Sequence, residues 1–414
     1  MTLHPLNPPR KFSPVCLHAR LLASPLLLSL TLLAGCAQPP IHHVHAAPDP
    51  RELAIQSFRQ QWAIDPDTTE SHGGITRLFA RDNYVFAYTK DGTSFVLDRA
   101  SGHLLHAETV RNGNQRLHPP VVLKEFIVYP TTTALEVYDK NGGLVRSKKL
   151  SYPIRTDAVG SRNYVYLGAD FSSGGRVVAI DVTNEYLDQR WELMYYNTDV
   201  TAAPALVGDI VYSAAGNGDV SAVTYDNREP VWPTLTFHTY GPVIANLVAD
   251  ETGVYVASAD TKLVALNRNN GVVKWQYFAG DQLRTEPTVS KDLVFIQVPT
   301  KGMVVLDKVG GKYNRTPRWE AADVTQFLAE DDKYVYVHRK DNAIVALDKT
   351  NGQAAFASNR RDFTVFAPNP RDGTIYAVTK DGQIMAIVPV LKSGQVGDVA
   401  FSPVGSREAV AAAR

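Results

Sequence analysis

Short apolar runs recur along the whole chain, and a turn signal separates each run from the next. One such stretch reads Val254–Ala257, then Leu263–Leu266, then a turn that ends at Gly271, and then a run that ends in Trp275. Runs of about four to six residues bounded by Gly, Asn and Asp are typical of β-strands joined as hairpins. A further apolar run opens each unit, as at 203–206. The pattern predicts a repeated meander of four short antiparallel strands, named A to D in chain order.

The tryptophans give the period of this repeat. Trp191, Trp232, Trp275 and Trp319 are 41, 43 and 44 residues apart, and Trp62 lies 129 residues before Trp191. A fixed period of about 42 residues indicates a repeat architecture. We expect a large ring in strand D to pack between neighbouring units, as structure rather than catalysis. The predicted strand D positions are Trp62, His106, Ser147, Trp191, Trp232, Trp275, Trp319 and Phe356.

The two ends of the repeat predict a closed ring. A single meander cannot bury its own apolar faces, and radial repetition buries them while leaving only short edges. Trp62 has no strands A to C before it, whereas the last unit, 363–388, has no strand D after it. The sequence therefore predicts an all-β fold over 58–390. This fold is an eight-bladed β-propeller of four-stranded antiparallel blades, with the ring closed by an N-terminal outer strand.

The first 35 residues have the features of a targeting signal. They contain no Asp or Glu, and three basic residues precede an apolar stretch at 21–34. That stretch is shorter than the roughly 20 residues that span a bilayer. It ends in Leu-Ala-Gly-Cys36, which resembles the lipobox of bacterial lipoproteins. We predict a signal peptide over 1–35 and lipidation at Cys36; a plain signal peptide with an incidental cysteine is the alternative.

Residues 36–57 are predicted to be a flexible tether that follows the lipidated cysteine, because four prolines interrupt any regular element. The tract His42–His45 within it is either a metal-binding tract or a histidine-rich linker. The absence of a neighbouring cysteine or carboxylate pair favours the linker. Residues 391–414 are rich in Ala, Gly and Ser and are predicted to be a disordered tail.

Charge and cysteine content narrow the possible functions. The 42 basic residues equal the 42 acidic residues, which excludes a polybasic nucleic-acid binder held by counterion release. Removal of 1–35 takes away three basic residues and leaves 39 against 42, a net charge of −3. Cys16 would leave with the signal, so the mature chain would keep only Cys36 and form no internal disulfide.

The repeat resembles a known family. Val264-Ala265-Leu266-Asn267, followed by Gly271 and Trp275, resembles the PQQ-type propeller repeat, which reads roughly ALD-x-x-TG-K-x-x-W. Together with the lipobox, it makes the chain most similar to the BamB family of outer-membrane assembly lipoproteins. The resemblance implies a monomeric, non-enzymatic scaffold, lipid-anchored at the periplasmic face of the outer membrane. Ala37, where Asp would favour the inner membrane, agrees with that location. The implied partner is BamA or another envelope protein.

One stretch departs from the family pattern. A Leu-rich loop with an Arg helps members of the family to grip their partner, and the corresponding stretch here, 193–200, has no Arg. Tyr195 and Tyr196 lie within it and are the candidate partner-binding residues, since aromatic side chains are enriched at interfaces.

The same repeat occurs in PQQ-dependent dehydrogenases, which resemble one another in a vicinal cysteine pair, a tryptophan beneath the cofactor and an Asp beside Ca²⁺. The mature chain would have no cysteine pair, and its tryptophans are all used by the repeat. We therefore expect no enzymatic activity, cofactor or metal. The alternative is a quinoprotein-like propeller that binds a small molecule, PQQ or a cell-wall polymer. Five carboxylates at the end of strand C are assigned to turns: Asp98, Asp139, Asp181, Asp307 and Asp348.

Overall fold

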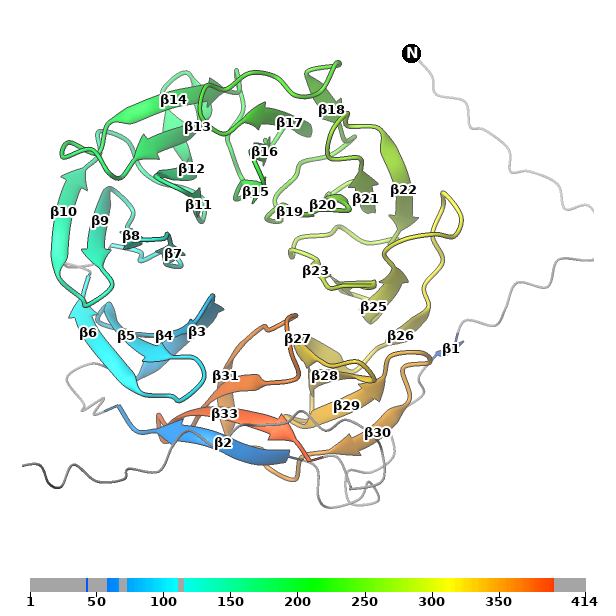
Figure 1. The fold of residues 1–414 in the computed structure, drawn as a ribbon. Coiled ribbons are helices and arrows are strands. Elements are labelled where there is room, and N and C mark those ends of the chain that lie inside the picture. The colour runs from blue at the N-terminus through cyan, green and yellow to red at the C-terminus, as the bar shows by residue number, and fades with distance from the viewer. Residues whose placement is uncertain (1–41, 44–57, 67–72, 111–114, 391–414) are drawn as a thin grey trace, which may run out of the picture. The chain divides into compact units, whose positions relative to one another are not determined.

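The computed structural model describes residues 42–43, 58–66, 73–110 and 115–390. The predicted signal peptide, Cys36, most of the tether and the C-terminal tail lie outside these residues. In the part of the chain that is described, no helix is long and apolar enough to cross a membrane. The described strands form eight sheets, arranged as the blades of a ring, and the four blade strands of each sheet are antiparallel (Figure 1). An eight-bladed β-propeller was predicted, and this prediction is confirmed.

The blades follow one another in chain order, and their strands run from the centre of the ring to its rim. Blade 1 contains β3 (Ile75–Arg81), β4 (Tyr84–Thr89), β5 (Thr93–Asp98) and β6 (Leu104–Thr109). Blade 2 contains β7 (Val121–Val122), β8 (Phe126–Pro130), β9 (Ala134–Asp139) and β10 (Leu144–Lys149). Blade 3 contains β11 (Val159–Ser161), β12 (Tyr164–Phe171), β13 (Gly174–Asp181) and β14 (Gln189–Met194). Blade 4 contains β15 (Ala205–Val207), β16 (Ile210–Ala214), β17 (Asp219–Thr224) and β18 (Thr236–His238).

The second half of the ring repeats this arrangement. Blade 5 contains β19 (Val248–Asp250), β20 (Gly253–Ala257), β21 (Lys262–Leu266) and β22 (Val273–Phe278). Blade 6 contains β23 (Thr288–Val289), β24 (Leu293–Val298), β25 (Gly302–Asp307) and β26 (Trp319–Ala321). Blade 7 contains β27 (Val324–Glu330), β28 (Tyr334–Arg339), β29 (Ile344–Asp348) and β30 (Ala354–Ala357). Blade 8 contains β31 (Phe363–Ala367), β32 (Ile375–Thr379), β33 (Ile384–Pro389) and, as its outermost strand, β2 (Phe58–Ile64).

The meander gives the ring two different faces. Because successive strands are antiparallel, the turns between strands B and C lie on the same face as the links from strand D to the next blade. We call this the connecting face. The turns between strands A and B and between strands C and D lie on the opposite face.

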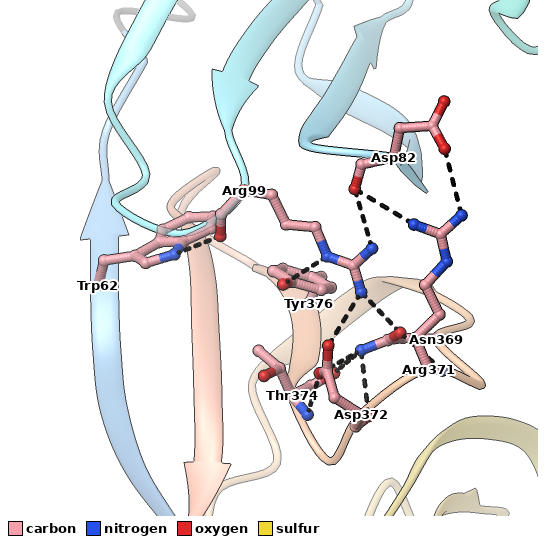
Figure 2. Close-up of polar contacts among 8 residues, drawn as sticks. All are labelled: Trp62, Asp82, Arg99, Asn369, Arg371, Asp372, Thr374 and Tyr376. Atoms are coloured by element: carbon pink, nitrogen blue, oxygen red, sulfur yellow. Dashed lines mark hydrogen bonds and ion pairs between the residues drawn. The ribbon is translucent and has the colours of Figure 1, made fainter. Parts of the chain in front are cut away.

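Ring closure follows the prediction. Strand β2 pairs with β33 in an antiparallel register that sets Trp62 opposite Ala386, so a strand from the start of the chain completes the last blade. Polar contacts reinforce this closing seam between blades 8 and 1 (Figure 2). Arg99 of blade 1 donates from Nε to Tyr376 Oη at 3.0 Å and from Nη2 to Asn369 Oδ1 at 2.7 Å. This seam therefore joins strands from the beginning of the described sequence to strands from its end.

Two outer edges carry additional chain. His42–His43, within the predicted tether, forms β1 and pairs in parallel with the start of β26. The long turn between β25 and β26 runs beside β22, where Gln276 donates its backbone N–H to Tyr313 O at 2.9 Å and accepts from Arg315 N at 2.7 Å. An exposed strand edge invites pairing with other chains, and these segments cover the edges of blades 5 and 6.

The hydrophobic core is a ring of layers between blades. One cluster, for example, joins Val305 and Trp319 of blade 6 to Val335 and Val345 of blade 7, all fully buried. Each blade therefore buries its apolar faces only against its two neighbours, and the stability of the ring depends on every seam.

We predict that Trp62→Ala destabilises the protein by about 3–5 kcal/mol, the usual cost of truncating a buried aromatic side chain. Trp62 is 7% exposed, and its loss would empty the closing seam. Chemical unfolding of the purified protein measures this change. Arg59→Ala, at an exposed position on the same strand, is the matched control and should change stability little. Equal stability of the two variants would contradict the closing role of Trp62.

Candidate partner-binding surface

The five tryptophans predicted for strand D share one contact across the seams, although Trp232 lies in the segment before β18 and not within the strand. Each indole N–H donates to a backbone carbonyl that lies one or two residues after the end of strand C in the next blade. A buried indole needs a hydrogen-bond acceptor, and this carbonyl supplies it. The bonds are Trp62 Nε1 to Arg99 O (3.1 Å), Trp191 to Tyr225 O (3.0 Å), Trp232 to Arg268 O (2.9 Å), Trp275 to Lys308 O (2.9 Å) and Trp319 to Lys349 O (3.0 Å).

The glycine of the repeat is required by the same contact. A Cβ added to Gly352 would lie 2.6 Å from the Trp319 ring, and one added to Gly271 would lie 2.8 Å from the Trp232 ring. Both glycines also have φ of +72°, in the left-handed region that disfavours side chains. The indole of one blade therefore lies flat on a glycine turn of the next.

Blade 2 corrects the predicted strand D positions by one residue. A bulge after Leu144 sets Arg146 opposite Val137, in the register that Trp319 has opposite Val305 in blade 6. Arg146, not Ser147, therefore occupies the strand D position. Its Nη1 donates to Val182 O of blade 3 at 3.2 Å, so the guanidinium takes the place of an indole N–H.

The two remaining seams also lack an indole. His106 of blade 1 packs against the Gly142 turn of blade 2, where an added Cβ would lie 2.9 Å from the ring, and it hydrogen-bonds Glu108 on its own strand. Phe356 of blade 7 contacts Phe58 of the closing strand, with ring centroids 5.6 Å apart.

Most of the strand C carboxylates hold turns, as the sequence suggests. Asp98 accepts from Ser101 N at 2.8 Å and Asp348 from Thr350 N at 2.8 Å, and Asp139 and Asp181 make similar bonds. The side-chain hydroxyls of Ser101 and Thr350, together with these backbone bonds, lower the pKa of Asp98 and Asp348. Asp307 departs from this role. It accepts from Arg318 Nε at 2.7 Å, because the turn that follows it is longer.

We predict that Gly352→Ala is more destabilising than Gly310→Ala. Both glycines have φ above +70°, so an alanine at either has a backbone cost of about 1–2 kcal/mol. Only the first also clashes with a tryptophan, which adds about 1–3 kcal/mol, since nothing lies within 4 Å of a Cβ at Gly310. Urea unfolding of both variants measures the difference, and equal losses would show that the indole does not need the glycine.

We predict that the free energy of unfolding falls less steeply with decreasing pH in Asp348→Asn than in the wild type. A carboxyl whose pKa is lower in the folded state stabilises the fold above its unfolded pKa of about 4 and loses that contribution as the pH falls through its folded pKa. Asparagine keeps an oxygen that accepts from the turn but cannot titrate. The free energy of unfolding, measured from pH 6 down to pH 2, should therefore fall less steeply in the variant. Parallel curves would contradict this assignment.

A cavity of about 760 Å³ lies within the ring. The innermost strands of blades 1 to 5 line most of its wall, with additional residues from blades 6 and 8. The lining includes charged side chains from blades 1, 3 and 6, among them Arg77, Asp157 and Glu286. In the described residues, no three His, Cys, Asp or Glu side chains approach closely enough to hold a metal ion.

The two candidate tyrosines have different environments. Tyr195 is 5% exposed, and its Oη hydrogen-bonds with Ser213 Oγ at 2.8 Å, while burial raises its pKa to about 12. Its side chain therefore packs in the seam between blades 3 and 4 and is not exposed to solvent. Tyr196 is 75% exposed and remains available.

Two further aromatic side chains are exposed on blades 4 and 5, and the sequence analysis missed both. Tyr240 is 87% exposed in the link after β18, and Phe278 is 50% exposed at the end of β22. The Nζ atom of Lys262 lies 4.9 Å from the Tyr240 ring centroid and 5.4 Å from that of Phe278. We call Tyr196, Tyr240, Phe278 and Lys262 the aromatic patch.

Backbone hydrogen bonds fix the loops that carry the patch. In the β16–β17 turn of blade 4, Gly216 N donates a hydrogen bond of 2.8 Å to Asp199 O. Asp199 lies in the link that contains Tyr196. In the same turn, Gly218 O accepts a hydrogen bond of 2.9 Å from Thr239 N. Thr239 lies in the link that contains Tyr240. Tyr196 and Tyr240 therefore lie in links held on either side of one turn, on the connecting face.

The repeat geometry defines a PQQ-like β-propeller: eight meander blades, with indoles packed on glycine turns across most seams. The chain belongs to the family described as outer membrane protein assembly factor BamB, whose model matches residues 54–248 and 244–328. Fold and family together indicate a protein-interaction scaffold.

Solved structures show the same fold. BamB from Moraxella catarrhalis is 16% identical, with a TM-score of 0.61, and the match covers 82% of this chain and 99% of that one. The computationally designed Ika8 protein is 18% identical, with a TM-score of 0.57, and the match covers 77% of this chain and 97% of that one. No curated protein matches the sequence.

Proposed function

We propose that this chain is a non-enzymatic scaffold that assists the assembly of outer-membrane β-barrel proteins, with BamA as its partner. It would be anchored by a lipid on Cys36 at the periplasmic face of the outer membrane. Membership of the BamB family and the lipobox-like sequence before Cys36 support this proposal. Tyr196 and the other residues of the aromatic patch form the proposed docking surface.

The aromatic patch is the observation that carries the docking proposal. Large aromatic side chains are normally buried, and exposed ones that cluster mark interaction sites. Tyrosine and phenylalanine also contribute much of the binding energy of interfaces because they bury a large area with few rotatable bonds. Tyr240 and Phe278 both lie against the Lys262 ammonium, which also lies 4.0 Å from the Asp260 carboxylate, so a partner that covers the rings would also meet an ion pair.

The rigid attachment of the links adds to this argument. The Tyr196 and Tyr240 links are tied to the β16–β17 turn by backbone bonds, so little conformational entropy is lost when a partner binds. The buried Oη of Tyr195 hydrogen-bonds Ser213 Oγ of blade 4, which also holds the first of these links in place. A surface that is ordered before binding suits a scaffold, which must hold its partner without folding around it.

A second candidate function is the binding of a small molecule or cell-wall polymer in the central cavity. The volume of about 760 Å³ favours it, since ligand pockets usually measure about 300–1,000 Å³. Retention of the protein on cell-wall material, or saturable binding of PQQ followed by absorbance, would support this second function.

We predict that the double variant Tyr196→Ala/Tyr240→Ala binds the periplasmic part of BamA at least tenfold more weakly than the wild type, because two exposed rings would be lost from the interface. Affinity would be measured with the purified lipid-free chain, and co-purification of the full lipoprotein from detergent-solubilised envelopes would be followed in parallel.

Tyr186→Ala is the matched control. Tyr186 is also strongly exposed, but it lies in the β13–β14 turn on the opposite face. Its removal should leave binding unchanged, and all variants should unfold at the wild-type midpoint. If no barrel-assembly component co-purifies with the wild type, the proposed partner is wrong. If the double variant binds as well as Tyr186→Ala does, the partner binds the ring at a place other than the aromatic patch.

A further inference from the structure

A second, smaller cavity of about 350 Å³ lies at the seam between blades 1 and 2. It is formed on the connecting face by the start of β3, the β4–β5 turn and the link that precedes β7. Thr76 and Arg77 line both this cavity and the central one, so the seam cavity lies beside the central cavity. We call it the seam pocket, and its lining residues are Thr76, Arg77, Tyr88, Thr89, Lys90, Gly92, Arg116 and Leu117.

The lining of the seam pocket is basic. Arg77, Lys90 and Arg116 contribute to its wall, and none of the described residues that line it is an Asp or a Glu. Arg116 is exposed, and its backbone N–H donates to Thr132 Oγ1 of blade 2 at 2.9 Å, which fixes the position of its Cα. Arg77 comes from the other side of the seam, on blade 1. The seam pocket is therefore lined by one arginine from each of the two blades.

Arg77 is held in place by neutral groups. Its Nη1 donates to Leu117 O at 2.7 Å, and its guanidinium carbon lies 4.8 Å from the Phe79 ring centroid. The acidic group that raises the pKa of Arg77 is Asp157, which already accepts a hydrogen bond from His118 Nδ1 at 3.0 Å. Among the described residues, no carboxylate lies within ion-pair distance of Arg77.

The electrostatics of Arg77 agree with an incompletely compensated cation. Burial lowers the pKa of its guanidinium, Asp157 opposes that effect, and Arg116 reinforces it. A partly buried cation without an ion pair gains more from an added anion than a solvated one does, because the surrounding dielectric constant is lower.

We propose that the seam pocket binds a carboxylate group, either of a small molecule or at the C-terminus of a peptide. Guanidinium groups present paired N–H donors that match the two oxygens of a carboxylate. Tyr88 and Leu117 add apolar wall for the group that carries the carboxylate. The proposal does not depend on the aromatic patch or on BamA.

The direct test is the binding of two simple carboxylates to the full mature chain, followed by calorimetry at low ionic strength. Benzoate represents a free small molecule, and N-acetylphenylalanine represents the end of a peptide. We expect either or both to bind with a dissociation constant that rises with salt concentration. Benzamide and N-acetylphenylalanine amide, which lack the charge, should bind at least tenfold more weakly.

Two variants locate the binding. Arg116→Gln alters an exposed side chain and should leave the unfolding midpoint unchanged while it weakens carboxylate binding at least tenfold. Arg77→Gln should weaken it as much, and Arg77→Lys should restore it only in part because an ammonium has no paired donors. Arg284→Gln is the matched control, since Arg284 is an exposed arginine in the link between blades 5 and 6 on the same face.

Three results would overturn the proposal. One is the absence of binding of both carboxylates to the wild type at millimolar concentration. Another is equal binding by the wild type and Arg116→Gln, which would place the carboxylate elsewhere. The third is tighter binding of inorganic phosphate than of either carboxylate, which would show that the pocket selects a different anion.

Discussion

The contact between an indole and the next blade's glycine turn is the interaction on which the ring depends. No blade has a core of its own, so each must be held flat against its neighbours by something that fixes both distance and angle. The indole of Trp319 does both, because its face packs on Gly352 and its N–H reaches Lys349 O. Close packing then allows no slippage between blades. The closing strand places Trp62 in the same contact with blade 1, so the last seam is built like the other seams that contain a tryptophan.

The seams that lack an indole differ in chemistry from the rest. Arg146 reproduces the hydrogen bond of an indole but not its packing, and His106 is paired with Glu108 in a site that is nearly closed to solvent. His106 Nε2 and Glu108 Oε2 have no hydrogen-bond partner among the described residues. The seam pocket lies at this same junction of blades 1 and 2. Polar groups and open volume therefore occur together where the repeat has lost its aromatic ring.

The sequence predicted what the repeat controls. The spacing of Trp191 to Trp319 established the period, and the missing strand of the last unit predicted closure by the segment around Trp62. The sequence did not reveal the bulge that places Arg146 in the strand D position, because a bulge depends on pairing with β9 and leaves little local signal. Nor did it separate Tyr195 from Tyr196, since neighbouring residues of a link point to opposite sides and only the packed structure shows which side is solvent.

Binding features escape sequence analysis here for a related reason. The aromatic patch and the seam pocket each combine residues from different blades, about one repeat apart in sequence, such as Arg77 with Arg116 or Tyr196 with Tyr240. The repeat constrains the strands and the glycine turns, whereas the links between blades are free to vary without loss of the core. Because these links are tied by backbone bonds to the turns beside them, a change of side chain there alters the surface without altering the ring. A propeller thus separates the residues that hold it together from those that meet a partner, and both features proposed here lie among the latter.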